Sequence, residues 1–310
     1  MNAVRYHSYG AANVLRYGEV DRPTAGPGQV LVRVAATSFN PVDAAIRAGY
    51  LREAFALRLP HTPGLDVAGT VAALGDGVVG LNVGDDVVGL LSMTDDGAAA
   101  NYVVVPAAAL SAAPTAIALQ QAAALPVAGL TAWQALFEHA GLESGQRVLI
   151  NGAGGAVGGY AVQLAAQAGA DVLAVTGPRS ADQASRYGAA QVLNYTAGPV
   201  SATAHEPVDV VLNLAKATAK EMAGLVAIVR PGGVLVTTVP PGPDAGGDVR
   251  VISMFLRSDA DQLSALVARV DTRQLQVAVD QCYPLADLAA VHHRSDAGDL
   301  HGKVLLVTGA

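Results

Sequence analysis

An apolar strand runs into a glycine-rich turn and then an apolar helix at residues 148–158, and this order of elements constrains the fold more than any other part of the sequence. Gly152, Gly155 and Gly158 recur at three-residue spacing. This spacing allows a tight turn, a close approach of the backbone to a pyrophosphate, and close packing of the helix on the strand. The phosphates would bind at the helix N-terminus, where free backbone N–H groups and the helix dipole attract negative charge.

The segments around this turn favour a dinucleotide-binding unit over the alternative, a turn that is a plain strand-to-helix corner. A strand is expected over residues 147–150, an apolar helix over 156–168 and a second strand over 171–176. Strand, glycine turn, helix and strand in this order are what a dinucleotide-binding βαβ unit needs. The sequence therefore predicts such a unit near the centre of the chain.

Length and composition are those of a globular chain with a sizeable core. The chain has 310 residues, which is comfortable for two domains, and 52% of them are hydrophobic while 15% are charged. Every long apolar run is interrupted before it could span a bilayer, and the first residues lack the apolar region of a secretion signal. We therefore expect a soluble protein that stays in the cytoplasm.

Charge and cysteine content exclude several classes of function. The formal net charge of −7 argues against a nucleic-acid surface, which needs many Lys and Arg contacts to phosphate. Cys282 is the single cysteine, which excludes an intrachain disulfide framework and a multi-cysteine zinc lobe, and which is compatible with a reducing compartment. A polyanionic cofactor must therefore be held by local groups.

The pattern of predicted elements changes once along the chain. Short β-like runs separated by turn residues fill residues 4–105, which predicts an all-β barrel with one short helix at 40–49. From about residue 119, apolar strands alternate with stretches long enough for crossover helices. This alternation predicts a doubly wound parallel sheet.

The last part of the chain is expected to complete both domains. A Pro/Gly-rich loop at 240–247 precedes a predicted strand at 249–254 and a predicted helix at 260–270. Two final strands, at 282–285 and 303–307, are expected to return to the barrel.

Eight short segments, spread over the whole chain, carry a family resemblance. They are NPVD at 40–43, PGLDVAG at 63–69, VGDDV at 83–87, LTAW at 130–133, the glycine turn at 152–158, NY at 194–195, RPGG at 230–233 and GKV at 302–304. Together they make the chain resemble the zinc-free quinone oxidoreductases of the medium-chain dehydrogenase/reductase superfamily, a group that includes zeta-crystallin and the enone oxidoreductases.

The resemblance implies an α/β chain with a GroES-like β-barrel catalytic domain (1–118 and 280–310), a Rossmann NADP-binding domain (119–279) and an active site in the cleft between them. Asn40 would face the nicotinamide and act in catalysis with Tyr50, and Thr131 would hold the carboxamide. The residues expected to bind the cofactor are Asn40, Thr131, Gly152, Gly155, Ala156, Val157, Gly158, Thr176, Arg179, Ser180, Tyr195, Asn213, Val239 and Phe255.

Two positions depart from the family pattern. Many members carry a tyrosine two residues after the Asp of the NPVD motif, where this chain has Ala45, and its nearest aromatic residue is Tyr50. Relatives often have an Asp at the strand end before the nicotinamide, where this chain has Asn213. The substrate pocket is therefore expected to be more open, and the strand end to keep its hydrogen bonds without a charge.

The end of the second Rossmann strand favours NADPH over NADH. An acidic residue there would bind the ribose 2′-hydroxyl and repel a 2′-phosphate, but residues 176–180 contain none. Thr176, Arg179 and Ser180 offer two hydroxyls and a guanidinium instead, and Tyr195 matches the family position whose phenol reaches this phosphate. The alternative is that Arg179 is a solvated loop residue and Tyr195 a packing residue.

The acids and histidines of the chain point to structural roles rather than to a metal. Asp66 lies in an apolar stretch and Asp43 in the first turn of the predicted helix, where its charge suits the helix dipole. Zinc-dependent relatives carry a His-Glu pair where this chain has Leu65 and Asp66, and its histidines show no metal-ligand spacing. We therefore expect no zinc site.

These observations lead to one functional prediction with two alternatives. The chain is predicted to be a zinc-independent NADPH:quinone oxidoreductase that acts by direct hydride transfer. The alternatives are an NADPH-dependent enone or 2-alkenal reductase, and a cofactor-binding protein without turnover. The expected partners are a small-molecule substrate and a second copy of the chain, in a homodimer joined at strand 249–254.

Overall fold

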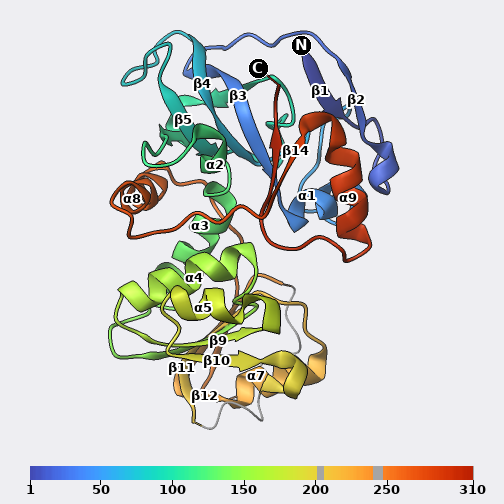
Figure 1. Cartoon of the computed structure of the whole chain (residues 1–310). Coiled ribbons are helices and arrows are strands. Elements are labelled where there is room, and N and C mark those ends of the chain that lie inside the picture. The colour runs from blue at the N-terminus through green and yellow to red at the C-terminus, as the bar shows by residue number, and fades with distance from the viewer. Residues whose placement is uncertain (201–205, 240–246, 310) are drawn as a thin grey trace. The chain divides into compact units, whose positions relative to one another are not determined.

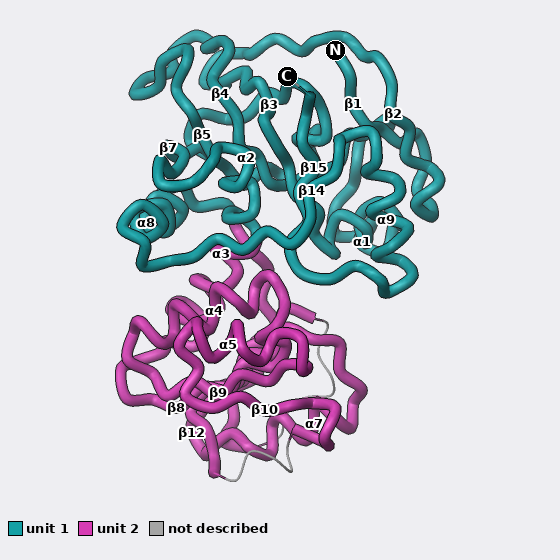
Figure 2. Tube along the Cα trace, in the orientation of Figure 1, with its two compact units in different colours: residues 1–127, 258–310 teal, residues 128–257 magenta. Residues whose placement is uncertain are grey.

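The structure is a computed structural model that describes residues 1–200, 206–239 and 247–309. The chain forms two compact units (Figures 1 and 2). Unit 1 comprises residues 1–127 and 258–310, and unit 2 comprises residues 128–257. Unit 2 is therefore inserted between two segments of unit 1.

These units differ in their bounds from the predicted domains. Helix α8 (Ala260–Asp271), expected in the Rossmann domain, belongs to unit 1, where it packs on strand β7 (Leu110–Ala112). The carboxylate of Asp271 also accepts hydrogen bonds from the backbone N–H groups of Thr115 and Ala116, at 2.7 and 2.9 Å. The domain limits stay a prediction.

Unit 1 is built on a seven-stranded, mostly antiparallel sheet. Besides β7, its strands are β3 (Gln29–Phe39), β4 (Asp66–Leu74), β5 (Asp86–Leu90), β6 (Tyr102–Pro106), β14 (Gln281–Pro284) and β15 (Val304–Val307). The order is β14-β15-β3-β4-β5-β7, and β6 also pairs with β3. The last two strands therefore return to the barrel sheet, as predicted from the sequence.

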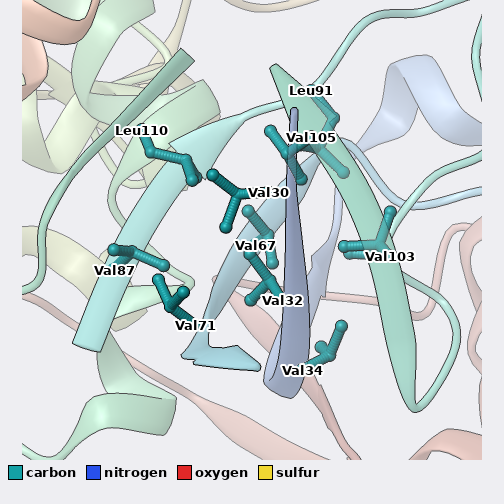
Figure 3. Packing of buried hydrophobic residues seen from close by; sticks show 11 residues of the cluster. Val30, Val32, Val34, Val67, Val71, Val87, Leu91, Val103, Val105 and Leu110 are labelled. Carbon is teal, nitrogen blue, oxygen red and sulfur yellow. The ribbon is translucent and has the colours of Figure 1, made fainter. Parts of the chain in front are cut away.

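Alternation of valines along β3 explains where the core of this sheet lies. Val30, Val32 and Val34 are two residues apart, so their side chains point to one face of the strand. Figure 3 shows them packed against apolar side chains from neighbouring strands and loops. The buried partners in this cluster are Val67, Val71, Val87, Leu91, Ala98, Val103, Val105 and Leu110.

The remaining elements of unit 1 are short. β1 (Asn2–Arg5) and β2 (Arg16–Glu19) form a two-stranded antiparallel sheet. The predicted helix after Asn40 is α1 (Pro41–Ala48), which has proline at its first position and ends at Gly49, whose φ of +83° favours glycine. The other helices and helical turns are η1 (Ala12–Val14), η2 (Ala107–Ala109), α2 (Leu119–Ala122), η6 (Leu285–Asp287) and α9 (Leu288–Asp296).

Unit 2 contains a six-stranded sheet in which every pair of neighbours is parallel. The strands are β8 (Arg147–Asn151), β9 (Asp171–Thr176), β10 (Gln191–Asn194), β11 (Val208–Asn213), β12 (Val229–Thr237) and β13 (Arg250–Ser253). Their order is β10-β9-β8-β11-β12-β13, so the direction of winding reverses between β8 and β11. This is the doubly wound order of dinucleotide-binding folds, in which ligands bind at the point of reversal.

Apolar strands and helices account for the core of unit 2. Val148, Leu149 and Ile150 of β8 are fully buried, as expected for a strand covered on both faces. Helix α4 (Ala156–Gln167) follows β8 and packs on β8 and β9. The other helical segments are α3 (Pro126–Trp133), which begins in unit 1, η3 (Gln134–His139), η4 (Pro178–Ser180), α5 (Ala181–Arg186), η5 (Tyr195–Ala197) and α7 (Ala219–Ala227).

The observed elements match the predicted ones closely, with one clear exception. β12 begins at Val229, five residues before the predicted start, because Val229 already pairs with Val208 of β11. The pairing then resumes at Val210 and Val234, so residues 230–233 form a bulge in which Gly232 has a φ of +79°. The predicted loop at 240–247 lies almost wholly outside the described residues. In the described part of the chain, no helix combines the length and apolarity that crossing a membrane would need.

Candidate active site

The glycine-rich turn of unit 2 has a shape that side chains would prevent. Gly152 has a φ of +92°, a conformation that favours glycine. A Cβ on Gly154 would lie 2.8 Å from the Cβ of Ser180, and one on Gly158 would collide with the Gly152 carbonyl. The turn leads to exposed Gly155, the N-cap of α4, and the first N–H groups of a helix have no partner within the helix. Residues 152–158, which comprise the glycine turn and the start of α4, form a cradle that fits a pyrophosphate.

The residues expected at the adenosine end of the cofactor gather next to this turn. Thr176 is buried at the end of β9, and its hydroxyl lies beside Gly154 together with the side chain of Ser180. A Cβ on Gly177 would be 3.2 Å from the ring of Tyr195, so this phenol covers the start of the loop. Tyr195 is 59% exposed and Arg179 is exposed as well. Sequence reasoning identified these residues but missed the steric role of Gly154.

A row of polar side chains crosses the sheet of unit 2 at the point of reversal. Asn151, Asn213 and Thr237 end β8, β11 and β12, and they share one register. The amide of Asn151 donates to Oδ1 of Asn213 at 2.8 Å, and the amide of Asn213 donates to Oγ1 of Thr237 at 3.2 Å. Asn213 is fully buried. Of these three residues, Asn213 alone was predicted from the sequence, because the register of the strands is visible only in the folded sheet.

In unit 1, Asn40 and Asp43 form the start of helix α1. The backbone N–H of Asn40 donates to Oδ2 of Asp43 at 2.9 Å, and both side chains are buried. This is the reciprocal contact of a capping box, which agrees with the structural role inferred for Asp43. Burial raises the pKa of Asp43 to about 7, against the lowering effect of the Asn40 N–H. Asp43 therefore holds a proton in part of the molecules at neutral pH.

The side chain of Asn40 is held by two buried charges. Its Nδ2 donates to Oδ2 of Asp66 at 2.8 Å, and its Oδ1 accepts from Nζ of Lys303 at 2.7 Å. Lys303 also donates to Asp66 at 3.1 Å, and Ser38 donates to the same carboxylate oxygen. The other oxygen of Asp66 accepts the N–H of Val127 at 2.7 Å, at the start of α3. Asp66 is thus structural, as inferred, and it holds Asn40 in one orientation.

Lys303 is a site residue that sequence reasoning missed. Its side chain is 3% exposed and forms an ion pair with Asp66, which is fully buried. Lysine is rarely buried without an anionic partner, so this pair is built into the fold. The available signal was the position of Lys303 between Gly302 and the apolar strand β15, within the GKV motif.

A small pocket of unit 1 brings two more titratable side chains next to Asp43. Tyr6, His61 and Thr62 line it, and the hydroxyl of buried Tyr6 has no hydrogen-bond partner among the described residues. Burial raises the pKa of Tyr6 and lowers the pKa of His61. Tyr6 and His61 therefore stay neutral near pH 7, and Asp43 and Asp95 are the acidic side chains that line the pocket.

The other predicted residues differ widely in exposure. Thr131 is buried in α3, whereas Val239 and the α4 residues Ala156 and Val157 are half-buried. Tyr50 follows α1 and is 84% exposed, and Phe255 follows β13 and is 70% exposed. Asn40 and Tyr50 belong to unit 1, and the remaining predicted cofactor residues belong to unit 2. Their roles stay predictions.

Among residues 1–200, 206–239 and 247–309, no group of three His, Cys, Asp or Glu side chains is arranged to hold a metal ion. Asp66, at the position where zinc-dependent relatives have a glutamate, is occupied by its four hydrogen-bond donors. Cys282 lies exposed on β14. The absence of a zinc site stays a prediction.

Comparison with protein families gives two matches along the chain. Residues 26–115 match the alcohol dehydrogenase GroES-like domain, and residues 187–306 match the family described as zinc-binding dehydrogenase. These two ranges cover much of unit 1 and the later part of unit 2.

Individual proteins match the chain over nearly its whole length. A chloroplast envelope quinone oxidoreductase homolog of Arabidopsis thaliana is 32% identical, and the alignment covers 99% of this chain and 98% of that protein. The solved quinone oxidoreductase of Coxiella burnetii has a TM-score of 0.89 with 27% identity and 99% coverage of both chains. A mycobacterial protein solved in complex with NADPH has a TM-score of 0.86 with 26% identity, covering 99% of this chain and all of that chain.

Proposed function

Because this chain belongs to the quinone oxidoreductases of the medium-chain dehydrogenase/reductase superfamily, and is therefore an oxidoreductase, we propose that it transfers a hydride from NADPH to a quinone. The observation that carries the proposal is the cradle at the point of sheet reversal. There the glycine turn and the N-terminus of α4 come together with Thr176, Ser180 and Tyr195.

The cradle fits NADPH better than NADH in its chemistry. The turn and the first N–H groups of α4 would bind the pyrophosphate without a basic side chain. Thr176 and Ser180 offer two hydroxyls beside the Arg179 guanidinium, and Tyr195, which follows β10, offers a phenol. Residues 176–180 contain no carboxylate that would repel a 2′-phosphate. A similar solved protein binds NADPH, which supports this choice.

The residues of this chain would orient the reactants and supply a proton. NADPH, when bound, supplies the hydride. Addition of a hydride to a quinone leaves an oxyanion that is delocalised over the ring, and one proton completes the hydroquinone. Asn40, held by Asp66 and Lys303, would orient the nicotinamide, Thr131 its carboxamide, and exposed Tyr50 would offer a hydroxyl to the substrate. Solvent or a hydroxyl group would provide the proton.

The test is oxidation of NADPH by the purified protein with a panel of quinones, enones and 2-alkenals, with and without a chelator. We expect turnover with quinones that the chelator leaves unchanged, no stoichiometric zinc by elemental analysis, and poor oxidation of simple alcohols. Faster turnover of enones or alkenals would favour the alternative C=C reductase. Stoichiometric NADPH binding without turnover on the whole panel would favour a cofactor-binding protein. Chelator-sensitive alcohol oxidation would contradict the zinc-free assignment.

We also propose that the protein works in the cytoplasm. Cys282, the single cysteine, is a free exposed thiol, which suits a reducing compartment. Fractionation of the native host, with antibody detection of the protein, tests this location.

A further inference from the structure

The polar row formed by Asn151, Asn213 and Thr237 continues beyond the sheet. Oγ1 of Thr237 donates to the carbonyl of Val239 at 3.1 Å, and the N–H of Val239 lies 3.2 Å from the same oxygen. The backbone is tied along the same line, because the N–H of Thr238 donates to the carbonyl of Asn213 at 3.2 Å. A continuous set of hydrogen bonds therefore runs from β8 to the residue that follows β12.

These hydrogen bonds have a direction. Asn151 donates to Asn213, Asn213 donates to Thr237, and Thr237 donates to the Val239 carbonyl. An amide at position 213 is needed for this, since it accepts at one end and donates at the other. A carboxylate at 213 would accept at both ends. The Thr237 hydroxyl would then have to donate to position 213 and release the Val239 carbonyl.

One end of the row lies next to the glycine turn, and the other end lies at Val239 after β12. Asn151 immediately precedes the glycine turn, and Gly152 is packed against the segment after Asn213, where a Cβ would be 3.3 Å from Leu214. The other end fixes Val239, which is one of the residues expected to bind the cofactor. Asn213 and Thr237 are fully buried, so the row is shielded from water, and such bonds are stronger than in solvent.

We propose that Asn151, Asn213 and Thr237 are positioning residues that hold Val239, and with it the nicotinamide end of the cofactor, in a fixed place relative to the pyrophosphate cradle. This inference rests on the proposed binding of NADPH by unit 2. It assigns a role to the neutral amide at 213, and it adds Asn151 and Thr237 to the site.

The experiment compares two ligands that differ at the nicotinamide end. NADPH has the complete cofactor, whereas 2′-phospho-ADP-ribose has the adenosine, the 2′-phosphate and the pyrophosphate but no nicotinamide. Titration calorimetry measures both affinities for the wild-type protein and for Asn213→Asp, Thr237→Val and Thr237→Ser. In Asn213→Asp and Thr237→Val we expect about a tenfold loss for NADPH, the size of one or two hydrogen bonds, and less than a twofold change for 2′-phospho-ADP-ribose.

Thr237→Ser keeps the hydroxyl, so it is expected to retain most of the NADPH affinity and to show that loss in Thr237→Val is not due to misfolding. Ser253→Ala is the matched control, because Ser253 shares the register of Thr237 on β13 but takes no part in the chain of hydrogen bonds described above. Equal losses for both ligands, or unchanged NADPH affinity in Thr237→Val, would overturn the positioning role. A wild-type protein that does not bind NADPH would contradict the proposed function instead.

Discussion

Arg179 is the residue on which the preference for NADPH most depends. It is exposed on the loop after β9, next to Ser180, and its guanidinium suits a forked contact to phosphate. We expect Arg179→Ala to weaken NADPH binding by about 1.5–3 kcal/mol, the value of a hydrogen bond to a charged group, while NADH binding changes little. Titration calorimetry with both cofactors measures this. Arg186→Ala, an exposed arginine on α5, is the control, and equal losses for both cofactors in Arg179→Ala would assign Arg179 another role.

A second residue-scale feature is the buried pair Arg47 and His292. Nη2 of Arg47 on α1 donates to both carboxylate oxygens of Asp296, at 3.0 and 3.2 Å, and its Nη1 lies 3.4 Å from Nδ1 of His292. His292 on α9 is fully buried, with its ring edge-on to Phe39 and with Nε2 lacking a hydrogen-bond partner among the described residues. Burial, followed by the charge of Arg47, lowers the pKa of His292 to about 3.

This pKa predicts how stability depends on pH. Below about pH 6.5 the unfolded chain binds a proton at His292, whereas the folded protein does not bind it until about pH 3. The free energy of unfolding therefore decreases as the pH is lowered through this range. At pH 5 the loss from this one group is about 2 kcal/mol. Urea unfolding at pH 7 and pH 5 should show that His292→Leu loses less stability on acidification than wild type by about this amount. The same pH dependence in both proteins would contradict the assignment, and exposed His293→Leu is the control.

At the scale of elements, the sequence predicted what local patterns determine. The apolar strand, glycine turn and helix at 147–168, and the helix from Pro41 to Gly49, were predicted because periodicity and caps are local signals. The early start of β12 was missed because Pro231 and Gly232 read as a turn, and they do form a bulge, but Val229 before them pairs with β11. Whether Val229 belongs to the strand depends on its pairing with the neighbouring strand β11, which the local sequence does not show.

In the candidate site, too, the residues within local motifs were predictable and those brought in by long-range pairing were not. Residues that contact the cofactor through motifs were named in advance, whereas Lys303 and the row at Asn151 and Thr237 were not. Lys303 meets Asp66 across 237 residues of sequence, and the row exists only because three strands share a register. Long-range pairing of this kind leaves no local pattern, and an isolated lysine or threonine normally reads as a solvated residue.

The ion pair of Lys303 and Asp66 joins the residue just before β15 to the first residue of β4, and these two strands lie far apart in the chain. We expect Lys303→Met to lower the free energy of unfolding by about 3–5 kcal/mol, because it leaves a buried carboxylate without its counter-charge. The double variant Lys303→Met with Asp66→Asn should recover part of this loss. Urea denaturation measures both, with exposed Lys220→Met as the control. A Lys303→Met effect no larger than that of the control would show that the pair contributes little.

At the scale of the whole molecule, both ends of the chain are needed for one unit. β15 pairs with β3, so the sheet of unit 1 is complete only after unit 2 has been made. The buried cluster around Asn40 has the same property, since Lys303 immediately precedes the last strand and Asn40 lies in the first third of the chain. A chain truncated before β14 would therefore lack both the final strands and the group that holds Asn40.

The last prediction concerns assembly. β13 is an edge strand of the unit 2 sheet, and its apolar residues Val251 and Ile252 are half-buried. An unpaired apolar edge is a template for pairing with another chain, so we predict a symmetric homodimer joined along β13. Light scattering at micromolar concentration should give twice the mass of one chain, and Ile252→Lys should convert the dimer to a monomer. Val192→Lys, which places the same charge on the opposite edge strand β10, should leave the dimer intact. A wild-type monomer would reject the prediction, and equal effects of the two variants would move the interface away from β13.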